Sequence, residues 1–231
     1  MSRRTIAALS ATVLLALSGC GDEEGPTSDD PGGSADGRTH AAQPENADGV
    51  ECQYPEGAPA ETEVDPPADR AAYTGEVPVT IETSVGDIEA TLDADSAPCT
   101  VNSFTSLASQ GYFDGTSCHR LTTEGIFVLQ CGDPAASGMG GPGYSFPDEL
   151  DREETYGPGT LAMANSGPDT NGSQFFIVYG DSPLDPAYTV FGEVSEEGIA
   201  VVEQVAAEGT DTGAGDGAPK TPVEITSVTV D

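Results

Sequence analysis

The alternation of apolar and polar residues predicts a series of short strands from about Gly75 onward. Val77–Ile81 and Ile88–Leu92 alternate around a turn at Val85–Asp87, which is typical of a β-hairpin. Five further strands are predicted over residues 125–131, 160–164, 174–179, 189–194 and 223–230. These short, turn-bounded segments indicate a mainly β domain.

Two segments instead have the periodicity of amphipathic helices. Pro98 opens the first and Gly111 ends it. Its apolar residues on one face are Val101, Phe104, Leu107 and Ala108. The second spans Glu197–Ala207, with Gly209 as the stop and with Ile199, Val202 and Ala206 facing inward. Many strands and two helices predict one closed antiparallel barrel with helical caps, over residues 73–231.

The N-terminal residues have the pattern of an export signal. Arg3 and Arg4 precede an apolar run, Ile6–Leu17, which is too short for a comfortable membrane-spanning helix. Leu17-Ser18-Gly19-Cys20 resembles a bacterial lipobox, which implies removal of residues 1–19 and lipidation of Cys20. We therefore expect a lipid-anchored protein on the outer face of the bacterial cytoplasmic membrane. The alternative is an ordinary signal peptide with a cysteine nearby.

Residues 20–72 are predicted to form a disordered tether. Their composition is acidic and rich in Gly, Pro, Ala and Ser, so they bury too little apolar surface to offset the entropy of ordering. Cys52 and Tyr54 mark the point where the tether is expected to touch the domain.

Four cysteines remain when Cys20 is set aside, and an even number in an exported chain favours disulfides, with three connectivities allowed. Cys118 and Cys131 flank a hairpin centred near Glu124-Gly125, so they would face each other across two strands. Cys52 would then pair with Cys99. Four free thiols are the alternative.

The net charge of −33, with only 7 lysines and arginines, excludes a nucleic-acid-binding surface. It also excludes docking on anionic lipid through a basic patch. The acidic excess favours solubility and suggests adaptation to a salty exterior, where repulsion is screened. Greatest stability in low salt would contradict that hypothesis.

The segment Leu161–Ile177 has an order of residues that neither a core nor a generic loop requires. Apolar residues run into the turn residues Gly167-Pro168 and Asn171-Gly172 and then into a β-prone run. The amides of Asn165 and Gln174 stand beside aromatic residues. An extended peptide needs such hydrogen-bond partners next to an apolar pocket.

This segment resembles the signature of the cyclophilin-type peptidyl-prolyl isomerases. Further blocks resemble that family in the same order, namely Tyr112–Thr116, His119-Arg120, Gln130–Asp133, Gly138–Gly141, Phe146–Glu149 and Thr189–Gly192. Together they cover nearly the whole region 97–194. The resemblance implies a closed eight-stranded barrel with two helices and isomerisation of X-Pro bonds without a cofactor or metal.

Arg120 is one of three basic residues after Gly75, with Arg152 and Lys220. A surface ion pair would explain it, but the resemblance implies that Arg120 is the principal catalytic residue. An X-Pro bond has cis and trans forms separated by a barrier of about 18–20 kcal/mol from amide resonance. A guanidinium that donates to the prolyl nitrogen stabilises the twisted state, in which resonance is lost.

The resemblance assigns the remaining roles by position. Gln130 is the glutamine that contacts the arginine and the substrate carbonyl. The proline ring is expected in a pocket made by Phe127, Val128, Phe176 and Leu184, and Tyr188 is expected to cover it. The residue before proline is expected on the backbone of Asn165, with Ala164 and Ser166 beside it and Gln174 lining the groove.

Three departures from the family pattern affect this prediction. The chain has no tryptophan, and Pro183 occupies the usual tryptophan position. Tyr188 replaces a histidine, and two extra residues separate Arg120 from Gln130. We therefore expect weakened cyclosporin binding but retained catalysis.

Other motifs are set aside. Gly138–Gly143 matches G-x-G-x-x-G but lacks a following helix, and a sequon at Asn171 lies inside the binding motif. His119, with Cys118 and Cys131, lacks the spacing of a zinc site, and no nucleophile elbow accompanies it. We therefore predict a monomeric isomerase of exported Pro-containing polypeptides. The alternatives are a holdase that binds such segments without turnover, and a structural envelope lipoprotein.

Overall fold

The structure is a computed structural model that describes Asn46 and residues 48–231. The predicted signal peptide, Cys20 with its lipobox and the first part of the predicted tether lie outside the described residues. Within the described part of the chain, no helix has both the length and the apolar character needed to cross a membrane.

The described strands form one antiparallel sheet. They are β1 (Glu76–Thr83), β2 (Gly86–Asp93), β3 (Thr116–Ser117), β4 (Arg120–Thr122), β5 (Phe127–Cys131), β6 (Thr160–Met163), β7 (Phe175–Gly180), β8 (Val190–Val194), β9 (Asp216–Gly217) and β10 (Glu224–Val230). Their order is β3-β10-β1-β2-β8-β6-β7-β5-β4-β9. All seven strands predicted by alternation are therefore present, with the hairpin turn at Ser84-Val85.

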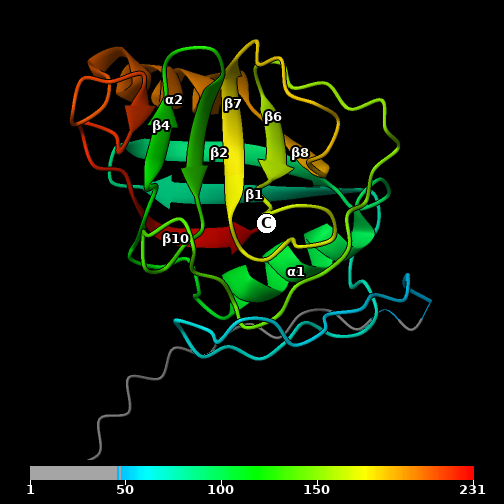
Figure 1. The fold of residues 1–231 in the computed structure, drawn as a ribbon. Helices are drawn as coiled ribbons and strands as arrows, with labels where there is room; N and C mark the ends of the chain where they lie inside the picture. The colour runs from blue at the N-terminus through cyan, green and yellow to red at the C-terminus, as the bar shows by residue number, and fades with distance from the viewer. Residues whose placement is uncertain (1–45, 47) are drawn as a thin grey trace, which may run out of the picture. The chain divides into compact units, whose positions relative to one another are not determined.

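The sheet is a curled half-barrel rather than the expected closed eight-stranded barrel. It has 10 strands, and the edge strands β3 and β9 are not paired with each other. Only Cys118-His119 separates β3 from β4, although they lie near opposite ends of the strand order, so the sheet must curl. Figure 1 shows β4, β7 and β6 crossing in front of β1, β2 and β10. The number eight follows from the family resemblance. The three strands that alternation does not predict, β3, β4 and β9, have only two or three residues, too few to produce an alternation pattern.

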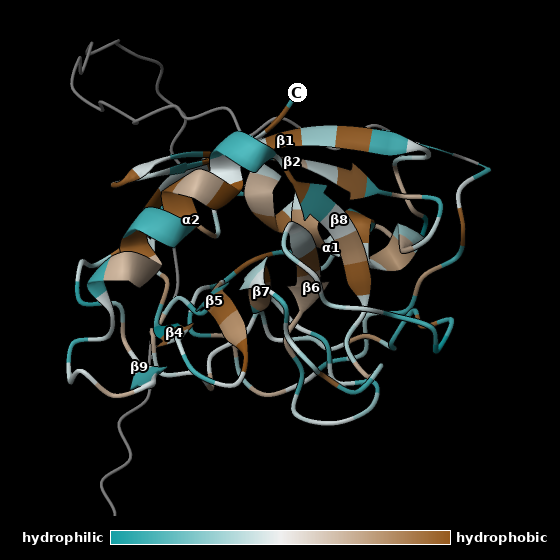
Figure 2. Cartoon of the chain, turned by 90° about the horizontal axis from the view of Figure 1, so that it is seen from above, coloured by the Kyte–Doolittle hydropathy of each residue, from teal (hydrophilic) through white to brown (hydrophobic). Residues whose placement is uncertain are grey.

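Two helices lie at opposite ends of the curled sheet, α1 (Pro98–Ser109) and α2 (Glu196–Glu208) (Figure 1). The predicted apolar face of α1 is buried. Ser195 caps α2 by accepting a hydrogen bond from the Gly198 N–H at 3.0 Å. In α2, Val202 is buried as predicted, Ile199 and Ala206 are only partly buried, and Val205 is buried instead. Figure 2 shows the resulting alternation of hydrophilic and hydrophobic residues along α2.

The core lies between the two layers of the curled sheet. Its centre is an aromatic cluster in which the Phe104 ring lies 5.1 Å from Phe113, 5.5 Å from Phe175 and 5.4 Å from Phe191, measured between centroids. These four side chains are at most 3 % exposed, so they form a closed apolar centre beneath the front strands.

Both predicted disulfides are present, Cys52–Cys99 and Cys118–Cys131. The first attaches the N-terminal described segment to α1. In addition, the Tyr54 hydroxyl donates to the Cys99 carbonyl at 2.8 Å, and the Asn102 amide donates to the Ala68 carbonyl at 2.9 Å.

The packed part of the chain therefore begins earlier than the predicted domain start at residue 73. Ala71 is 1 % exposed, and its N–H donates to the Val50 carbonyl at 2.8 Å. Composition does not predict this order because the segment from Gly49 to Ala72 is held by contacts with α1 and with residues 143–146 rather than by an apolar core of its own.

Candidate active site

Four strands of the front layer present one row of side chains. The register pairs Arg120 of β4 with Gln130 of β5, Gln130 with Phe176 of β7, and Phe176 with Ala162 of β6. Paired residues in an antiparallel sheet point to the same face. The strands therefore place a cation, an amide and an apolar surface side by side on the face opposite the core.

A hydrogen-bonded relay links the polar members of this face. Arg120 Nη1 donates to Gln130 Oε1 at 3.4 Å, and Gln130 Nε2 donates to Gln174 Oε1 at 2.8 Å. Gln174 Nε2 then donates to the Gly140 carbonyl at 2.9 Å. The relay brings together three predicted site residues and fixes the direction in which each amide points.

Arg120 also forms an ion pair that the sequence did not reveal. Its Nε and Nη2 donate to the two carboxylate oxygens of Asp216 at 2.9 and 2.7 Å. The hydrogen bond to this carboxylate raises the pKa of Arg120, and the same bond lowers the pKa of Asp216. Arg120 thus forms an ion pair, the alternative explanation given above for this arginine, and it is also a member of the relay.

An apolar cluster lies beside the relay on the same face. Its buried members are Val128, Tyr156, Ala162, Phe176 and Val178, and Ile126, Ala164, Leu184, Tyr188 and Val190 pack against them. The Phe176 and Tyr188 rings meet edge to face at 5.5 Å between centroids. The predicted pocket residues Val128, Phe176, Leu184 and Tyr188 therefore lie together.

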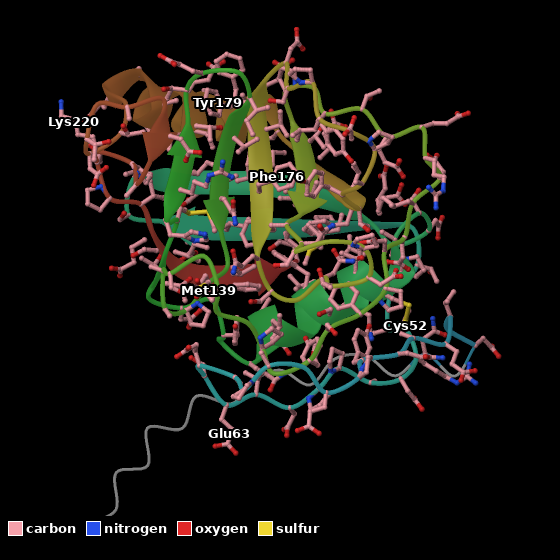
Figure 3. All side chains as sticks on the ribbon, viewed as in Figure 1. Cys52, Glu63, Met139, Phe176, Tyr179 and Lys220 are labelled. Atoms are coloured by element: carbon pink, nitrogen blue, oxygen red, sulfur yellow. A yellow bond between two sulfur atoms is a disulfide. The ribbon has the colours of Figure 1, made fainter. Side chains whose placement is uncertain are left out.

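Phe127, which was also predicted for this pocket, is not part of it. Successive strand residues point to opposite faces, so Phe127 lies on the other side from Val128. Its ring lies 5.9 Å from that of Tyr179, in a separate shallow hollow whose wall includes Ala206 of α2. Figure 3 shows Phe176 at the middle of the front face and Tyr179 near α2. Ile126, the residue before Phe127, instead packs against the apolar cluster.

Tyr156 is a pocket residue that the sequence did not single out. Its hydroxyl donates to the Tyr188 carbonyl at 2.9 Å and accepts from the Tyr188 N–H at 3.0 Å. Tyr156 is 4 % exposed and precedes β6 in a loop outside every family block. It fixes the backbone of Tyr188 and thereby the ring that faces Phe176.

The surface that runs from the Arg120–Gln130–Gln174 relay across the apolar cluster to the Asn165 segment is called the groove below. The Ala164 N–H donates to the Gln174 carbonyl and the Asn165 side-chain amide donates to the Ala187 carbonyl, both at 2.9 Å. Among the described residues, the backbone N–H and C=O of Asn165 have no hydrogen-bond partner. These two groups are the ones that an extended peptide would use.

A glycine-rich loop after β5 forms the polar end of the groove. The buried carboxylate of Asp133 accepts backbone N–H bonds from Ala135 at 2.8 Å, Gly138 at 2.6 Å and Gly140 at 3.1 Å. Burial alone would raise the pKa of Asp133, but these bonds outweigh it and lower the pKa. A Cβ on Gly140 would lie 2.1 Å from Asp133 Oδ1, so only glycine fits there.

His119 points into the protein and has no catalytic geometry. Both ring nitrogens are buried without a hydrogen-bond partner within the described residues, and burial lowers the pKa of the ring. In this part of the chain no group of three or more His, Cys, Asp or Glu side chains is arranged to hold a metal ion.

The fold and the groove define a class of protein. The family model described as "Cyclophilin type peptidyl-prolyl cis-trans isomerase/CLD" matches residues 78–230. The chain therefore belongs to the cyclophilin-type peptidyl-prolyl cis-trans isomerase family.

The relatives that resemble this chain include two mycobacterial proteins, both called "Probable peptidyl-prolyl cis-trans isomerase B". The Mycobacterium leprae protein is 47 % identical over 207 residues, which cover 82 % of this chain and 70 % of the relative. The Mycobacterium tuberculosis protein is 46 % identical over 203 residues, which cover 79 % and 65 %. This chain thus spans about two thirds of the length of these relatives.

A Cryptosporidium parvum cyclophilin-type isomerase has a similar crystal structure. Its TM-score is 0.61 at 31 % identity, with 68 % of this chain and 98 % of that chain covered. A second structure of that isomerase, determined in the presence of the dipeptide Ala-Pro, has a TM-score of 0.60, again at 31 % identity, and covers 67 % of this chain and 98 % of its own.

Proposed function

We propose that this chain accelerates cis–trans isomerisation of X-Pro bonds in exported polypeptides, with Arg120 as the catalytic residue. The observation that carries the proposal is the register row Arg120–Gln130–Phe176–Ala162. It sets a guanidinium beside the apolar cluster around Phe176, with an amide between them, and an apolar surface of this kind suits the proline ring.

The reaction needs no covalent intermediate. The pocket around Phe176 holds the proline ring, and Arg120 donates a hydrogen bond to the prolyl nitrogen when rotation makes its lone pair available. Gln130, already bonded to Arg120, contacts the substrate carbonyl. Because the donor bonds the nitrogen better in the twisted state than in either planar state, it lowers the barrier.

The residue before proline is held by the backbone of Asn165. Its N–H and C=O have no hydrogen-bond partner among the described residues, so an extended segment can add to them as a strand adds to a sheet edge. Ala164 and Ser166 flank this contact, and Gln174 lines the groove between it and Gln130.

A lipid anchor on the outer face of the cytoplasmic membrane is part of the same proposal. Its support is the lipobox-like Leu17–Cys20 and two disulfides, which are typical of oxidising compartments. Cys20→Ser should move the protein from the membrane fraction to the soluble exported fraction. An unchanged membrane fraction would contradict the anchor without affecting the catalytic proposal.

The test of catalysis is the cis-to-trans relaxation of a short X-Pro peptide. The wild type should shorten the spontaneous time of tens to hundreds of seconds. Arg120→Ala should lose about 10²- to 10³-fold in kcat/KM. Arg152→Ala removes the same charge from an exposed loop and is the matched control, with kcat/KM unchanged.

The holdase alternative predicts a different result. The wild type would then bind the peptide, as measured by chemical-shift changes of the groove residues, but would leave the relaxation time unchanged. That combination would overturn the catalytic proposal.

A further inference from the structure

Asp216 reaches Arg120 from a loop that is far away in the sequence. β9 pairs with β4 so that Thr122 lies opposite Asp216 and Leu121 opposite Gly217. Arg120 is therefore a diagonal neighbour of Asp216, at a separation that a long side chain can span. The carboxylate accepts from Nε and Nη2 at 2.9 and 2.7 Å, which is a bidentate fork.

The loop that carries Asp216 is held on both sides. Within the loop, the Thr210 hydroxyl donates to the Ala214 carbonyl at 2.6 Å and the Asp211 N–H to the Ala218 carbonyl at 2.9 Å. Towards the β4–β5 hairpin, the Thr123 N–H donates to the Gly215 carbonyl at 2.8 Å. Asp216 thus sits on a fixed backbone.

The loop also packs against the lengthened hairpin. A Cβ on Gly215 would lie 2.8 Å from the Glu124 side chain, in the turn that has two more residues than the common family spacing. The lengthened hairpin turn therefore contacts the same loop that carries Asp216, the partner of Arg120.

We infer that Asp216 is a positioning residue for Arg120, an inference that rests on the proposed function. An unrestrained arginine side chain samples many rotamers, at a cost in entropy when one must be selected. Asp216 binds the edge of the guanidinium formed by Nε and Nη2. The remaining nitrogen, Nη1, is then held toward Gln130 and the pocket. Asp216 itself does not touch the substrate.

The ion pair contributes little to folding. The side chains of Arg120 and Asp216 are 40 % and 56 % exposed, and pairs this open to solvent add little to stability. Variants at Asp216 should therefore fold as the wild type does, so a change in turnover reports positioning rather than unfolding.

The kinetic test compares Asp216→Ala and Asp216→Asn with Asp211→Asn, which removes a charge from the same loop without touching Arg120. Asp216→Ala should lower kcat about tenfold with KM nearly unchanged. Asp216→Asn keeps one acceptor oxygen, so its kcat should fall by less than that of Asp216→Ala. The kcat of Asp211→Asn should equal that of the wild type. Equal kcat in all four proteins, or an equal loss in Asp211→Asn, would overturn the inference.

The second test does not depend on activity. In the wild type, the Arg120 Nε–Hε resonance should have the order parameter of a rigid side chain, and Asp216→Ala should make it mobile. A rigid resonance in an inactive wild type would refute the proposed function but keep the positioning. A mobile resonance in an active wild type would refute the positioning alone.

Discussion

Two neighbouring phenylalanines in β7 lie on opposite faces of the sheet. Phe175 is 0 % exposed and packs in the closed core, with its ring 5.5 Å from Phe104 and 5.8 Å from Phe113. Phe176 is 5 % exposed and faces the groove, with its ring 6.3 Å from Tyr156 and 5.5 Å from Tyr188. Burial hardly distinguishes them. Their difference lies in the neighbours across the strands, since Phe176 shares its row with Gln130 and, one strand further, Arg120.

The largest expected effect separates the core face from the groove face. Phe175→Ala should lower the free energy of unfolding by about 3–5 kcal/mol, because it leaves a cavity among aromatic rings. The kcat/KM per folded molecule should stay within about twofold of the wild type. Denaturant unfolding and peptide relaxation measure the two quantities, and a specific loss of turnover would break the comparison.

Phe176→Ala should instead affect turnover more than stability. Loss of the ring that holds proline should lower kcat/KM by about 30-fold, or about 2 kcal/mol at 1.4 kcal/mol per tenfold. The loss of stability should be smaller than for Phe175→Ala, since Phe176 belongs to the smaller apolar cluster and Phe175 to the main core. An unchanged kcat/KM would place the proline ring elsewhere.

Asp133→Asn should weaken the glycine-rich loop at the end of the groove. Hydrogen bonds to a charged group contribute about 1.5–3 kcal/mol, so the variant should lose roughly 2 kcal/mol of stability at neutral pH. The folded pKa of Asp133 lies below its unfolded value of about 3.9. The stabilisation is therefore fully present above that value and is lost as pH falls through the folded pKa.

Denaturant unfolding of Asp133→Asn and the wild type at several pH values checks this sign. The difference between the two proteins should be constant from about pH 5 to 7 and should shrink below about pH 4. A difference that grows in acid would contradict the assignment.

Tyr156→Phe should have the smallest effect. It removes the hydroxyl that bonds both backbone groups of Tyr188, at a cost of about 1 kcal/mol. Because the ring remains in the cluster, the change should appear as a modest rise in KM for the X-Pro peptide. Tyr179→Phe, on the opposite face of β7, is the matched control and should leave KM unchanged.

The local pattern of the chain predicts the strands and helices well. Alternation in Val77–Ile81 reports one buried face, and the structure confirms it. The periodicity of 98–110 predicts the helix and its buried apolar residues, but α1 is buried on all sides from Thr100 to Ala108, including polar residues that the pattern places outside. The same alternation already contradicted the placement of Phe127 next to Val128 in one pocket, since adjacent strand residues face opposite ways. The family resemblance places Phe127 by its position in a motif, and position in a motif does not fix the face of the strand.

The parts that the sequence did not predict depend on contacts between distant segments. Asp216 meets Arg120 through a two-residue strand, and Tyr156 meets Tyr188 from a loop. Neither segment has a periodicity of its own. Similarly, the segment from Gly49 to Ala72 is ordered by contacts with α1 and with residues 143–146. Composition carries no information on such contacts, and it therefore predicts disorder.

The most direct test of the central claim is exchange NMR of an X-Pro peptide bound to Arg120→Lys. Lysine keeps the positive charge but lacks the planar fork that Gln130 and Asp216 orient. We predict peptide affinity close to that of the wild type and an on-enzyme exchange rate at least 100-fold lower. An exchange rate within about threefold of the wild type would show that a point charge suffices and would contradict the oriented guanidinium as the source of catalysis.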